Sequence, residues 1–361
     1  MLPIPSPELL AHGAANAFDL LVRGGVADLR RTPARIVREA PQGTLFQYLP
    51  GERGGRELPV LLVPPLAAPS TCFDLRRGCS MAEHLLAAGH DTYLVDYGPI
   101  GFSDRELGLE HWVHDVLPSA IRATSAEAGG RPVQVVGWCL GGIMALLAMA
   151  ADGTLPVNAI AAVASPFDFR ELRLFAALRG LANLTNGVVG TAVYRALGGA
   201  PAPLVKRAFQ LSALDKHVTK PVMLLANLHD RDALAQMEAV DDFTDNMHAY
   251  PGRTMGQLYH RFFRVNDLAD GHLRLGGRDI DLADVAVPVL AVAGQGDTLA
   301  PPAAVHHVGQ LLVGAPEVQL KTAPGGHLGV LAGRSAARTT WHAIDEFFAR
   351  HARDPSLAAA A

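Results

Sequence analysis

The chain contains the stretch Val133-Gln134-Val135-Val136-Gly137-Trp138-Cys139-Leu140-Gly141-Gly142, in which a strand pattern runs into a cysteine flanked by glycines. The valines at its start favour a buried β-strand, and the apolar run from Ile143 to Ala150 favours a helix. The glycines between these two segments predict a sharp turn. A cysteine at the apex of such a strand–turn–helix unit is either a nucleophile or a buried structural residue.

The residues around Cys139 indicate that it is a nucleophile rather than a buried structural residue. Gly137 and Gly141 are the small neighbours that keep the helix from clashing with the strand when the apex residue has a strained backbone. The thiol would lie at a helix N-terminus, where the helix dipole favours the thiolate. The backbone N–H of Leu140 would point at the oxyanion that forms on an attacked carbonyl group.

A nucleophile at such a turn requires an acid and a histidine, and the chain supplies both in the expected order. Asp297 follows a continuous apolar run, and His327 follows the last predicted strand behind a pair of glycines. Because the carboxyl ends of parallel strands meet at one edge of a sheet, we predict a Cys139–Asp297–His327 triad there. Asp104 and Asp242 are weaker candidates for the acid, because neither follows a late strand.

Composition restricts the class of protein. Of 361 residues, 49% are hydrophobic and 18% are charged, which is enough for a sizeable core and argues against intrinsic disorder. The net charge of −4, without any basic cluster, excludes a nucleic-acid-binding surface. The cysteines Cys72, Cys79 and Cys139 are an odd number, which indicates a reduced, cytoplasmic protein rather than a disulfide scaffold.

Neither a metal site nor a membrane segment is predicted. The motifs His111-x-x-His114 and His306-His307 lack a third ligand at a convincing spacing. Residues 132–151 carry no charge, but their glycines and their change from strand to helix periodicity argue against a membrane span. The N-terminus has no basic region before its apolar residues, so no signal peptide is expected.

Strand and helix patterns alternate in residues 44–165 and 266–351, which predicts an α/β core with a mostly parallel sheet covered on both faces. Residues 1–43 are predicted to be an N-terminal helical segment. Its amphipathic helix, Pro7 to Arg23, would cover the core or contact a partner, and we favour the core. Residues 352–361 are expected to be a frayed tail.

The alternation fails in residues 166–265, which predicts an inserted helical cap over the active site. Its apolar surface could cover an acyl chain or could pack on itself. The helices predicted in this segment are Leu172–Leu184, Val188–Leu197, Pro203–Leu214, Ala233–Met247 and Met255–Phe263.

The chain resembles the polyhydroxyalkanoate synthases, in particular the shorter type that lacks a large N-terminal domain. The most specific match is Gly325-Gly326-His327-Leu328-Gly329-Val330, which is similar to the histidine motif of the family. Further matches are Val63-Pro64-Pro65-Leu66, Val95-Asp96-Tyr97-Gly98, Asn266-Asp267-Leu268 and Val287-Pro288-Val289-Leu290. The turn at the cysteine also looks like that of dienelactone hydrolases, which are shorter and have the acid much sooner after the cysteine.

The resemblance implies an α/β-hydrolase fold and an acyltransferase. Cys139 would accept a 3-hydroxyacyl group from coenzyme A, His327 would activate the thiol and later the acceptor hydroxyl group, and Asp297 would orient His327. A polyester would grow in this way. Backbone N–H groups would hold the oxyanion, from Leu140 and from Leu66 or Ala67. The coenzyme A thioester is a substrate, and no bound cofactor is expected.

Other functions remain open for the same residues. With water as the acceptor, the enzyme would be a thioesterase, an esterase or a lactone hydrolase. With a small alcohol it would make an ester in specialised metabolism, and without activity it would be a subunit that pairs with a true synthase. The resemblance implies a second synthase subunit or a homodimer as partner. It also implies a cytoplasmic location, which could include the surface of a polymer granule.

Overall fold

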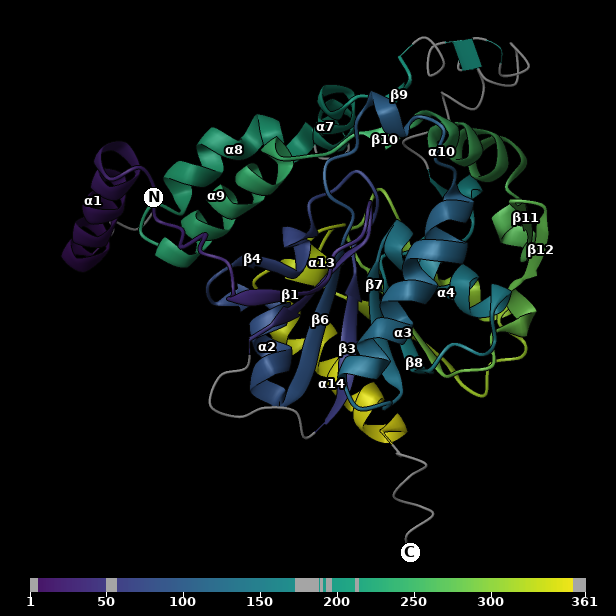
Figure 1. Cartoon of the computed structure of the whole chain (residues 1–361). Coiled ribbons are helices and arrows are strands. Elements are labelled where there is room, and N and C mark those ends of the chain that lie inside the picture. Colours follow the sequence, from purple (N-terminus) through teal and green to yellow (C-terminus); the bar gives the residue numbers. More distant parts are fainter. Residues whose placement is uncertain are drawn as a thin grey trace, which may run out of the picture.

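An eight-stranded sheet forms the centre of the computed structural model, which describes residues 6–49, 57–172, 188, 191–192, 197–211 and 214–352 (Figure 1). In spatial order its strands are β1 (Ala34–Arg38), β2 (Thr44–Tyr48), β6 (His90–Asp96), β3 (Glu57–Val63), β7 (Val133–Trp138), β8 (Val157–Val163), β13 (Val289–Gly294) and β14 (Val318–Ala323). The six strands β6, β3, β7, β8, β13 and β14 are parallel to one another. At the other edge, β2 pairs antiparallel with both β6 and β1. The predicted mostly parallel sheet is confirmed.

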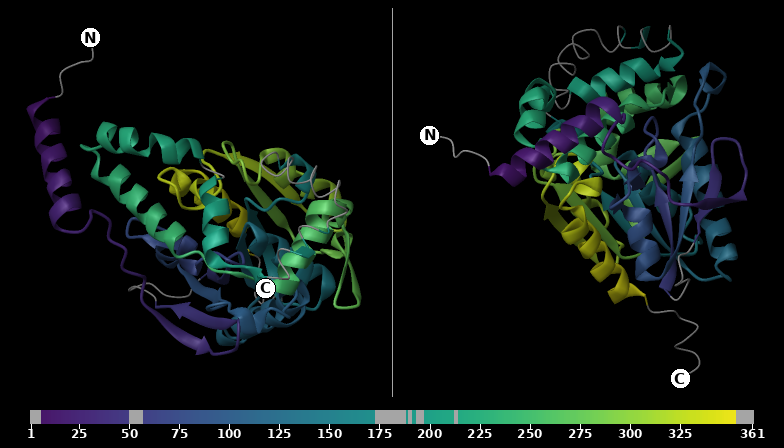
Figure 2. Two further views of the ribbon diagram at one scale, coloured as in Figure 1. Left: turned by 90° about the horizontal axis from the view of Figure 1, so that it is seen from above. Right: turned by 90° about the vertical axis from the view of Figure 1, so that its left-hand side faces the viewer.

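Helices cover both faces of this sheet (Figures 1 and 2). One face carries α2 (Met81–Ala88) and α14 (Thr340–His351), and the other carries α3 (Leu117–Glu127) and α4 (Leu140–Ala151). This division follows from right-handed crossovers, because the chain moves across the sheet in opposite directions before and after β6. Helices on both faces complete the predicted α/β architecture.

The central strands are buried, as their continuous apolar runs predict. β7 and β13 are buried over their whole length, and β3 is buried beyond its first residue. The uncharged stretch at residues 132–151 is divided between β7 and the almost wholly buried α4. In the part of the chain that the structure describes, no helix has both the length and the apolar composition needed to cross a bilayer.

Residues 1–43, predicted to be an N-terminal helical segment, contain a β-strand in addition to the helix. Ala34–Arg38 is the edge strand β1, which pairs antiparallel with β2. Its side chains are mostly exposed, and Arg35 pairs with Glu127 at 3.1 Å. A short, charged strand lacks the apolar alternation from which strands are predicted, and its charges protect the exposed edge from further pairing.

The helix α1 (Pro7–Val22) begins after Ser6, whose side chain accepts the N–H of Leu9, but it does not cover the core. It projects from the body of the protein near α8 (Leu214–Ala226) and α9 (Arg231–Asp245) (Figure 2). Its polar side faces inward: Asn16 Nδ2 donates to the carbonyl of Leu228 at 2.9 Å, and Asp19 pairs with Arg231 at 2.5 Å. Its large apolar side chains are exposed, together with Glu8 and His12: Leu9, Leu10, Phe18, Leu21 and Val22. The prediction that this helix covers the core is wrong. Polar contacts, and not burial of its apolar side, hold α1 against the segment that carries Leu228 and Arg231.

The described part of the predicted cap is also helical. α7 (Ala202–Leu211), α9, and α10 (Gly252–Gln257) with its continuation η6 (Leu258–Val265) lie where helices were predicted, whereas α8 was not predicted. The helices predicted at residues 172–184 and 188–197 lie mostly outside the described residues, as does the tail at 352–361 apart from Ala352. The division of the chain into core, cap and tail therefore stays a prediction.

Small two-stranded sheets accompany the central sheet in the described residues. β4 (Asp74–Arg76) pairs with β5 (Cys79–Ser80), and β9 (Gly199–Ala200) pairs with β10 (Tyr250–Pro251). A hairpin of β11 (His272–Leu275) and β12 (Arg278–Asp281) lies against α4. Pairs this short carry almost no periodic signal, so sequence patterns do not predict them.

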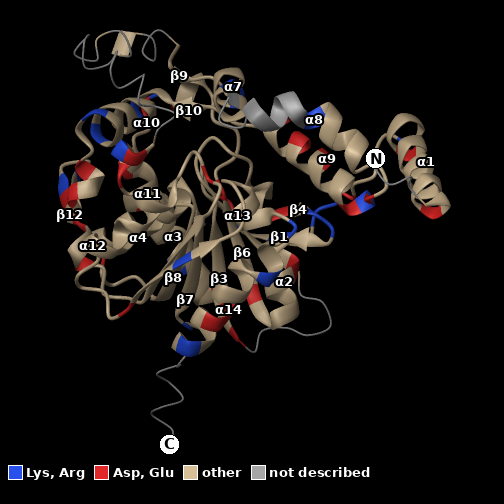
Figure 3. Cartoon of the chain, turned by 180° about the vertical axis from the view of Figure 1, so that it is seen from behind, with Lys and Arg blue, Asp and Glu red and all other residues tan. Residues whose placement is uncertain are grey.

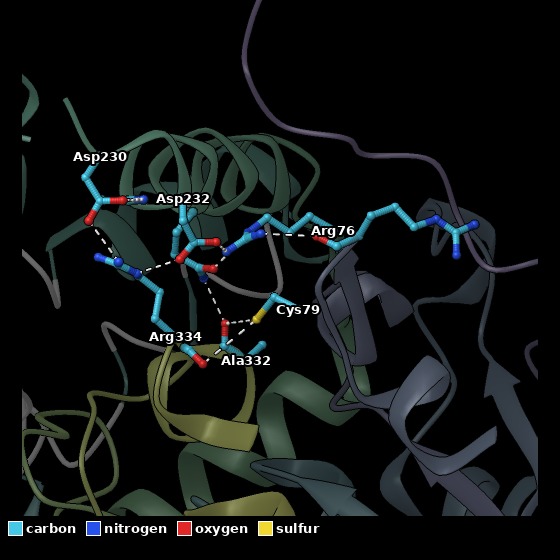
Figure 4. A network of polar contacts seen from close by, with 10 residues as sticks. Arg76, Cys79, Asp230, Asp232, Ala332 and Arg334 are labelled. Atoms are coloured by element: carbon cyan, nitrogen blue, oxygen red, sulfur yellow. Dashed lines mark hydrogen bonds and ion pairs between the residues drawn. The ribbon is translucent and has the colours of Figure 1, made fainter. Parts of the chain in front are cut away.

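A polar network fixes α9 to the core (Figure 4). Arg76 of β4 pairs with Asp232 of α9 at 2.6 Å, and Arg334 pairs with the same carboxylate at 2.7 Å. Gln236 of α9 donates from Nε2 to the carbonyl of Ala332 at 2.8 Å. Ala332 ends the short helix α13 (Gly329–Ala332), which directly follows the predicted catalytic histidine. The network thus joins a cap helix to the segment that carries this histidine.

Candidate active site

The turn at Cys139 has the shape that its sequence predicts. β7 ends at Trp138, Cys139 has φ 53° and ψ −123°, and α4 begins at Leu140. The N–H of Cys139 donates to the carbonyl of Val163 on the neighbouring strand at 2.8 Å. A cysteine at positive φ is strained, and this hydrogen bond and the packed helix hold it there. The half-buried thiol is therefore fixed at the carboxyl edge of the sheet.

Gly137 and Gly141 each allow a close approach that a side chain would block. A Cβ on Gly137 would lie 2.5 Å from Cα of Gly142, so β7 could not meet α4. A Cβ on Gly141 would lie 2.2 Å from the carbonyl oxygen of Val63 at the end of β3. The absence of a side chain at Gly137 thus lets β7 and α4 approach each other, as expected. The absence of a side chain at Gly141 lets α4 approach the end of β3 and the loop that follows it.

Asp297 and His327 meet at the same edge, since they follow the neighbouring strands β13 and β14. His327 Nδ1 lies 2.8 Å from Asp297 Oδ2, and the two side chains are only 9% and 0% exposed. The second carboxylate oxygen of Asp297 accepts the backbone N–H groups of Leu299 and Ala300, each at 2.8 Å. The carboxylate is thus held from behind and can fix the orientation of the imidazole ring.

The electrostatic surroundings favour the protonated form of His327. Burial alone lowers the pKa of His327, but the charge of Asp297, followed by the charge and hydrogen bonding of Cys139, outweighs burial and raises this pKa to about 10. At neutral pH the ring is therefore an imidazolium next to the Asp297 carboxylate. The structure thus brings together the three side chains that the sequence singled out.

Trp138, to which the sequence assigned no role, holds His327 in place. Its Nε1 donates to the backbone carbonyl of His327 at 3.1 Å, and its ring lies 5.2 Å from the imidazole between centroids. The same indole contacts Phe243 of α9 at 6.0 Å between centroids, and it is 1% exposed. Trp138 is therefore a positioning residue, which connects the turn, the histidine and the cap helix.

We expect Trp138→Phe to slow alkylation of Cys139 by iodoacetamide about three- to tenfold, the effect of one lost hydrogen bond. The variant keeps the aromatic contact but frees the His327 backbone, so the pH profile of alkylation should shift as well. Trp341→Phe is the matched control, since Trp341 is also buried and donates from Nε1 to the Leu331 carbonyl at 2.7 Å. If both variants lose the same alkylation rate and neither shifts the pH profile of alkylation, Trp138 has only a structural role.

Leu66 and Ala67 lie in the loop after β3, and β3 pairs with β7 as far as Gly137. Both residues are buried, and Ala67 has φ 63°. The hydroxyl group of Tyr97 donates to the carbonyl of Pro64 in the same loop at 3.1 Å, which fixes its position. The loop thus runs beside the turn at the cysteine, where an oxyanion hole requires it. Which N–H group faces the oxyanion, that of Leu66 or that of Ala67, stays a prediction.

Tyr250 is near the thiol, although no sequence signal marks it. It lies on β10 and pairs with Ala200 of β9. Its partial burial and the charge of Cys139 raise the pKa of the phenol, which keeps the ring neutral. A two-residue strand within the cap has no periodicity, so only the fold brings Tyr250 to the site.

The weaker candidates for the acid have other partners. Asp104 accepts hydrogen bonds from Gln42 Nε2 at 3.0 Å and from the N–H of Gly101 at 2.7 Å, which fixes the loop after β6. Asp242 lies on α9 and pairs with Arg31 at 3.8 Å. Their contacts are structural, so Asp297 is the acid that reaches His327.

Three histidines of the two motifs contact backbone carbonyl groups, and His111 Nδ1 lies 3.7 Å from Oδ2 of Asp115. His114 Nε2 lies 3.2 Å from the carbonyl of Leu275, and His307 Nε2 lies 2.8 Å from that of Ala269. His306 makes a similar contact with Lys321 at 3.0 Å. Within the described ranges, no group of histidine, cysteine, aspartate and glutamate side chains is arranged to hold a metal ion.

Comparison with known families and structures identifies the class of protein. A family model described as alpha/beta hydrolase fold matches residues 59–333. The structure of alpha/beta hydrolase domain-containing protein 10 from mouse has a TM-score of 0.51 at 14% identity, covering 88% of this chain and 99% of that one. The chain belongs to the alpha/beta hydrolase fold family, as its strand–turn–helix stretch indicates.

Its named relatives are polymerases. The chain is 25% identical to the poly(3-hydroxyalkanoate) polymerase subunit PhaC of Haloferax mediterranei, over 88% of this chain and 64% of that protein. It is also 25% identical to PhaC of Allochromatium vinosum, over 94% of this chain and 93% of that protein. The chain thus spans less than two thirds of the first relative and nearly all of the second. The resemblance to polyhydroxyalkanoate synthases is confirmed.

Proposed function

We propose that this protein is a polyhydroxyalkanoate synthase-like acyltransferase that moves 3-hydroxyacyl groups from coenzyme A to a hydroxyl group through an acyl-cysteine. The observation that carries the proposal is a cysteine in a strained turn beside the buried His327–Asp297 pair. The PhaC polymerase subunits among its relatives support the choice of donor and acceptor.

In the first half-reaction, the sulfur of Cys139 attacks the thioester carbonyl, and the N–H groups of Leu140 and the loop after β3 hold the oxyanion. The bond between the carbonyl carbon and the coenzyme A sulfur then breaks. His327 gives its proton to the departing thiolate, so free coenzyme A leaves and the imidazole becomes neutral. The acyl group remains on Cys139 as a new thioester.

In the second half-reaction, neutral His327 removes the proton from a 3-hydroxyl group, whose oxygen attacks the acyl-cysteine. An ester bond forms, the bond to Cys139 breaks, and the starting pair of thiolate and imidazolium is restored. Acylation itself prepares this step. It removes the Cys139 contribution that helps to raise the pKa of His327, so this pKa falls and the ring gives up its proton more readily.

A cysteine suits this transfer better than a serine. Exchange of one thioester for another costs little free energy, so the acyl-cysteine keeps its capacity to acylate an alcohol. A serine ester would already have lost most of that capacity. The choice of Cys139 at the turn therefore favours transfer to a hydroxyl group over hydrolysis.

The test is incubation of purified protein with (R)-3-hydroxybutyryl-coenzyme A and longer 3-hydroxyacyl thioesters, following free thiol and product mass. Release of thiol with a growing polyester would establish the proposal. Release with free hydroxy acid alone would make the protein a hydrolase with the same triad. Absence of both products, with a Cys139 that alkylates readily, would exclude 3-hydroxyacyl transfer by this chain alone.

The proposal extends to partners and location. The exposed apolar side of α1, which includes Leu10, Leu21 and Val22, is where we expect a second synthase subunit or a second copy of the chain to bind. The mass of the purified protein in solution, with and without a Leu21→Glu substitution, distinguishes a homodimer from a monomer. A cytoplasmic location, where three unpaired thiols persist, belongs to the same proposal.

A further inference from the structure

A cavity lies apart from the triad, since Cys139, Asp297 and His327 are not among the residues that line it. Its volume is about 520 Å³, and it lies between the loop after β6 and the helix that begins with α10. Phe102, Arg105 and Glu106 line it from the loop, and Arg253 and Arg261 line it from the helix. No sequence motif marks this cavity, and the proposed acyl transfer does not use its residues.

The cavity is formed by close contact between two backbones. The N–H of Arg253 donates to the carbonyl of Arg105 at 2.8 Å, and Thr254 donates to the carbonyl of Leu107 at 3.1 Å. A Cβ on Gly252 would lie 3.2 Å from the Arg105 carbonyl oxygen and 2.9 Å from that of Gly198, so a side chain there would push α10 away from both segments. The cavity walls are therefore held by hydrogen bonds rather than by the surface side chains alone.

The lining of the cavity is cationic and aromatic. Arg105, Arg253 and Arg261 contribute three positive charges, against one carboxylate among the lining residues, that of Glu106. Blue segments of the ribbon mark basic residues near α10 in Figure 3. The Phe102 ring is 66% exposed, and the guanidinium of Arg105 lies 4.6 Å from its centroid. An exposed aromatic ring beside several arginines is the combination that stacks on a base and pairs with phosphate groups.

Carboxylates near the cavity do not use up these donors. Arg261 contacts Asp267 through Nη1 at 3.3 Å, and Arg253 contacts Glu110 through Nη2. Neither Asp267 nor Glu110 lines the cavity. Each guanidinium has five N–H donors in a planar fork, so an arginine that binds one carboxylate can also bind a phosphate.

The position of the cavity fits a long substrate that reaches Cys139. Its α10 wall begins two residues after Tyr250. Tyr250 is close enough to Cys139 for the charge of the cysteine to raise the pKa of its phenol. Its loop wall continues from Tyr97, which holds the predicted oxyanion loop at Pro64. β9, β10 and α10 lie together above the sheet in Figure 1. A thioester on a flexible arm could therefore reach the thiol while its far end occupied the cavity.

We propose that this cavity binds the phosphorylated nucleotide end of coenzyme A, with the phosphate groups on Arg253 and Arg261 and the adenine on Phe102. The inference rests on the proposed function for the identity of the ligand. It adds a binding site for the leaving group that lies apart from the triad.

The test uses calorimetry with free coenzyme A, which requires no reaction. Adenosine 3′,5′-bisphosphate, inorganic pyrophosphate and pantetheine serve as fragments. We expect Arg261→Gln to weaken binding of coenzyme A and of the bisphosphate about tenfold, the effect of one lost charge-assisted hydrogen bond. Phe102→Ala changes an exposed side chain, so it should weaken both ligands without affecting folding. Arg274→Gln is the matched control, since Arg274 is an exposed arginine that faces Asp279 at 3.7 Å and does not line the cavity.

Each result decides the question. Coenzyme A binding that is equal in the wild type and both cavity variants would overturn the site and leave the proposed transfer untouched. Pyrophosphate that binds as tightly as the bisphosphate would reduce the cavity to a general anion site, which also overturns the proposal. If acyl transfer fails but the bisphosphate binds and both variants weaken it, the nucleotide site stands and the proposed function does not.

Discussion

Replacing Cys139 with alanine should lower thiol release from 3-hydroxyacyl-coenzyme A by about a thousandfold or more, because the acyl group then has no covalent acceptor. Cys139→Ser should retain a small fraction of activity, since serine is a weaker nucleophile and its ester is a poorer acyl donor. The measurement is the rate of free thiol formation, together with intact-protein mass after a short incubation. A mass increase equal to the acyl group in the wild type only would identify the acyl-cysteine.

Cys72→Ser is the control for this experiment. Cys72 is wholly buried, and burial raises the pKa of its thiol well above the usual value, so it should neither alkylate nor react. Burial likewise raises the pKa of Cys79, which contacts the Ala332 carbonyl at 3.2 Å (Figure 4). Full acyl transfer by the C139A protein would remove Cys139 from the mechanism, whatever the other cysteines do.

The residues of the site could be predicted because each follows a strand with a strong local signal. The valines before Cys139 and the apolar run before Asp297 identify buried parallel strands, and such strands bring their carboxyl ends together. The role of Trp138 was not predicted, although it adjoins the cysteine. Its partner is the backbone of His327, far away in the chain, and a single sequence does not reveal such a contact.

The edges of the fold were predicted less well, for a physical reason. β1 has charged, exposed side chains, and α1 buries Asn16 and Asp19 while it exposes leucines. Apolar periodicity indicates that a helix has two different sides, but hydrogen bonds and ion pairs decide which side of α1 is buried. Tyr250 and the cationic cavity depend on two-residue strands and a loop, where no periodic pattern exists.

Asp297→Asn should reduce acyl transfer by roughly 10⁴-fold with little change in the position of the ring. The amide can still accept the N–H groups of Leu299 and Ala300, but it can present an NH₂ group to His327 Nδ1. The imidazole would then hold the wrong tautomer. Burial lowers the pKa of His327 and the Asp297 carboxylate raises it, so the pKa should fall from about 10 when the carboxylate is lost. NMR titration of the imidazole ring measures this change.

The same substitution should change how stability depends on pH. The pKa of His327 in the folded protein, about 10, lies above its ordinary value of 6.5, so the pair stabilises the fold fully below pH 6.5. This contribution is lost as the pH rises through 10. The difference in melting temperature between the wild type and D297N should therefore be largest near neutral and mildly acidic pH and narrow toward pH 10. Asp104→Asn is the control, because Asp104 caps a loop and does not contact His327. A difference that stays constant across this range, or an unchanged pKa of His327 in D297N, would mean that Asp297 does not set the charge of the histidine.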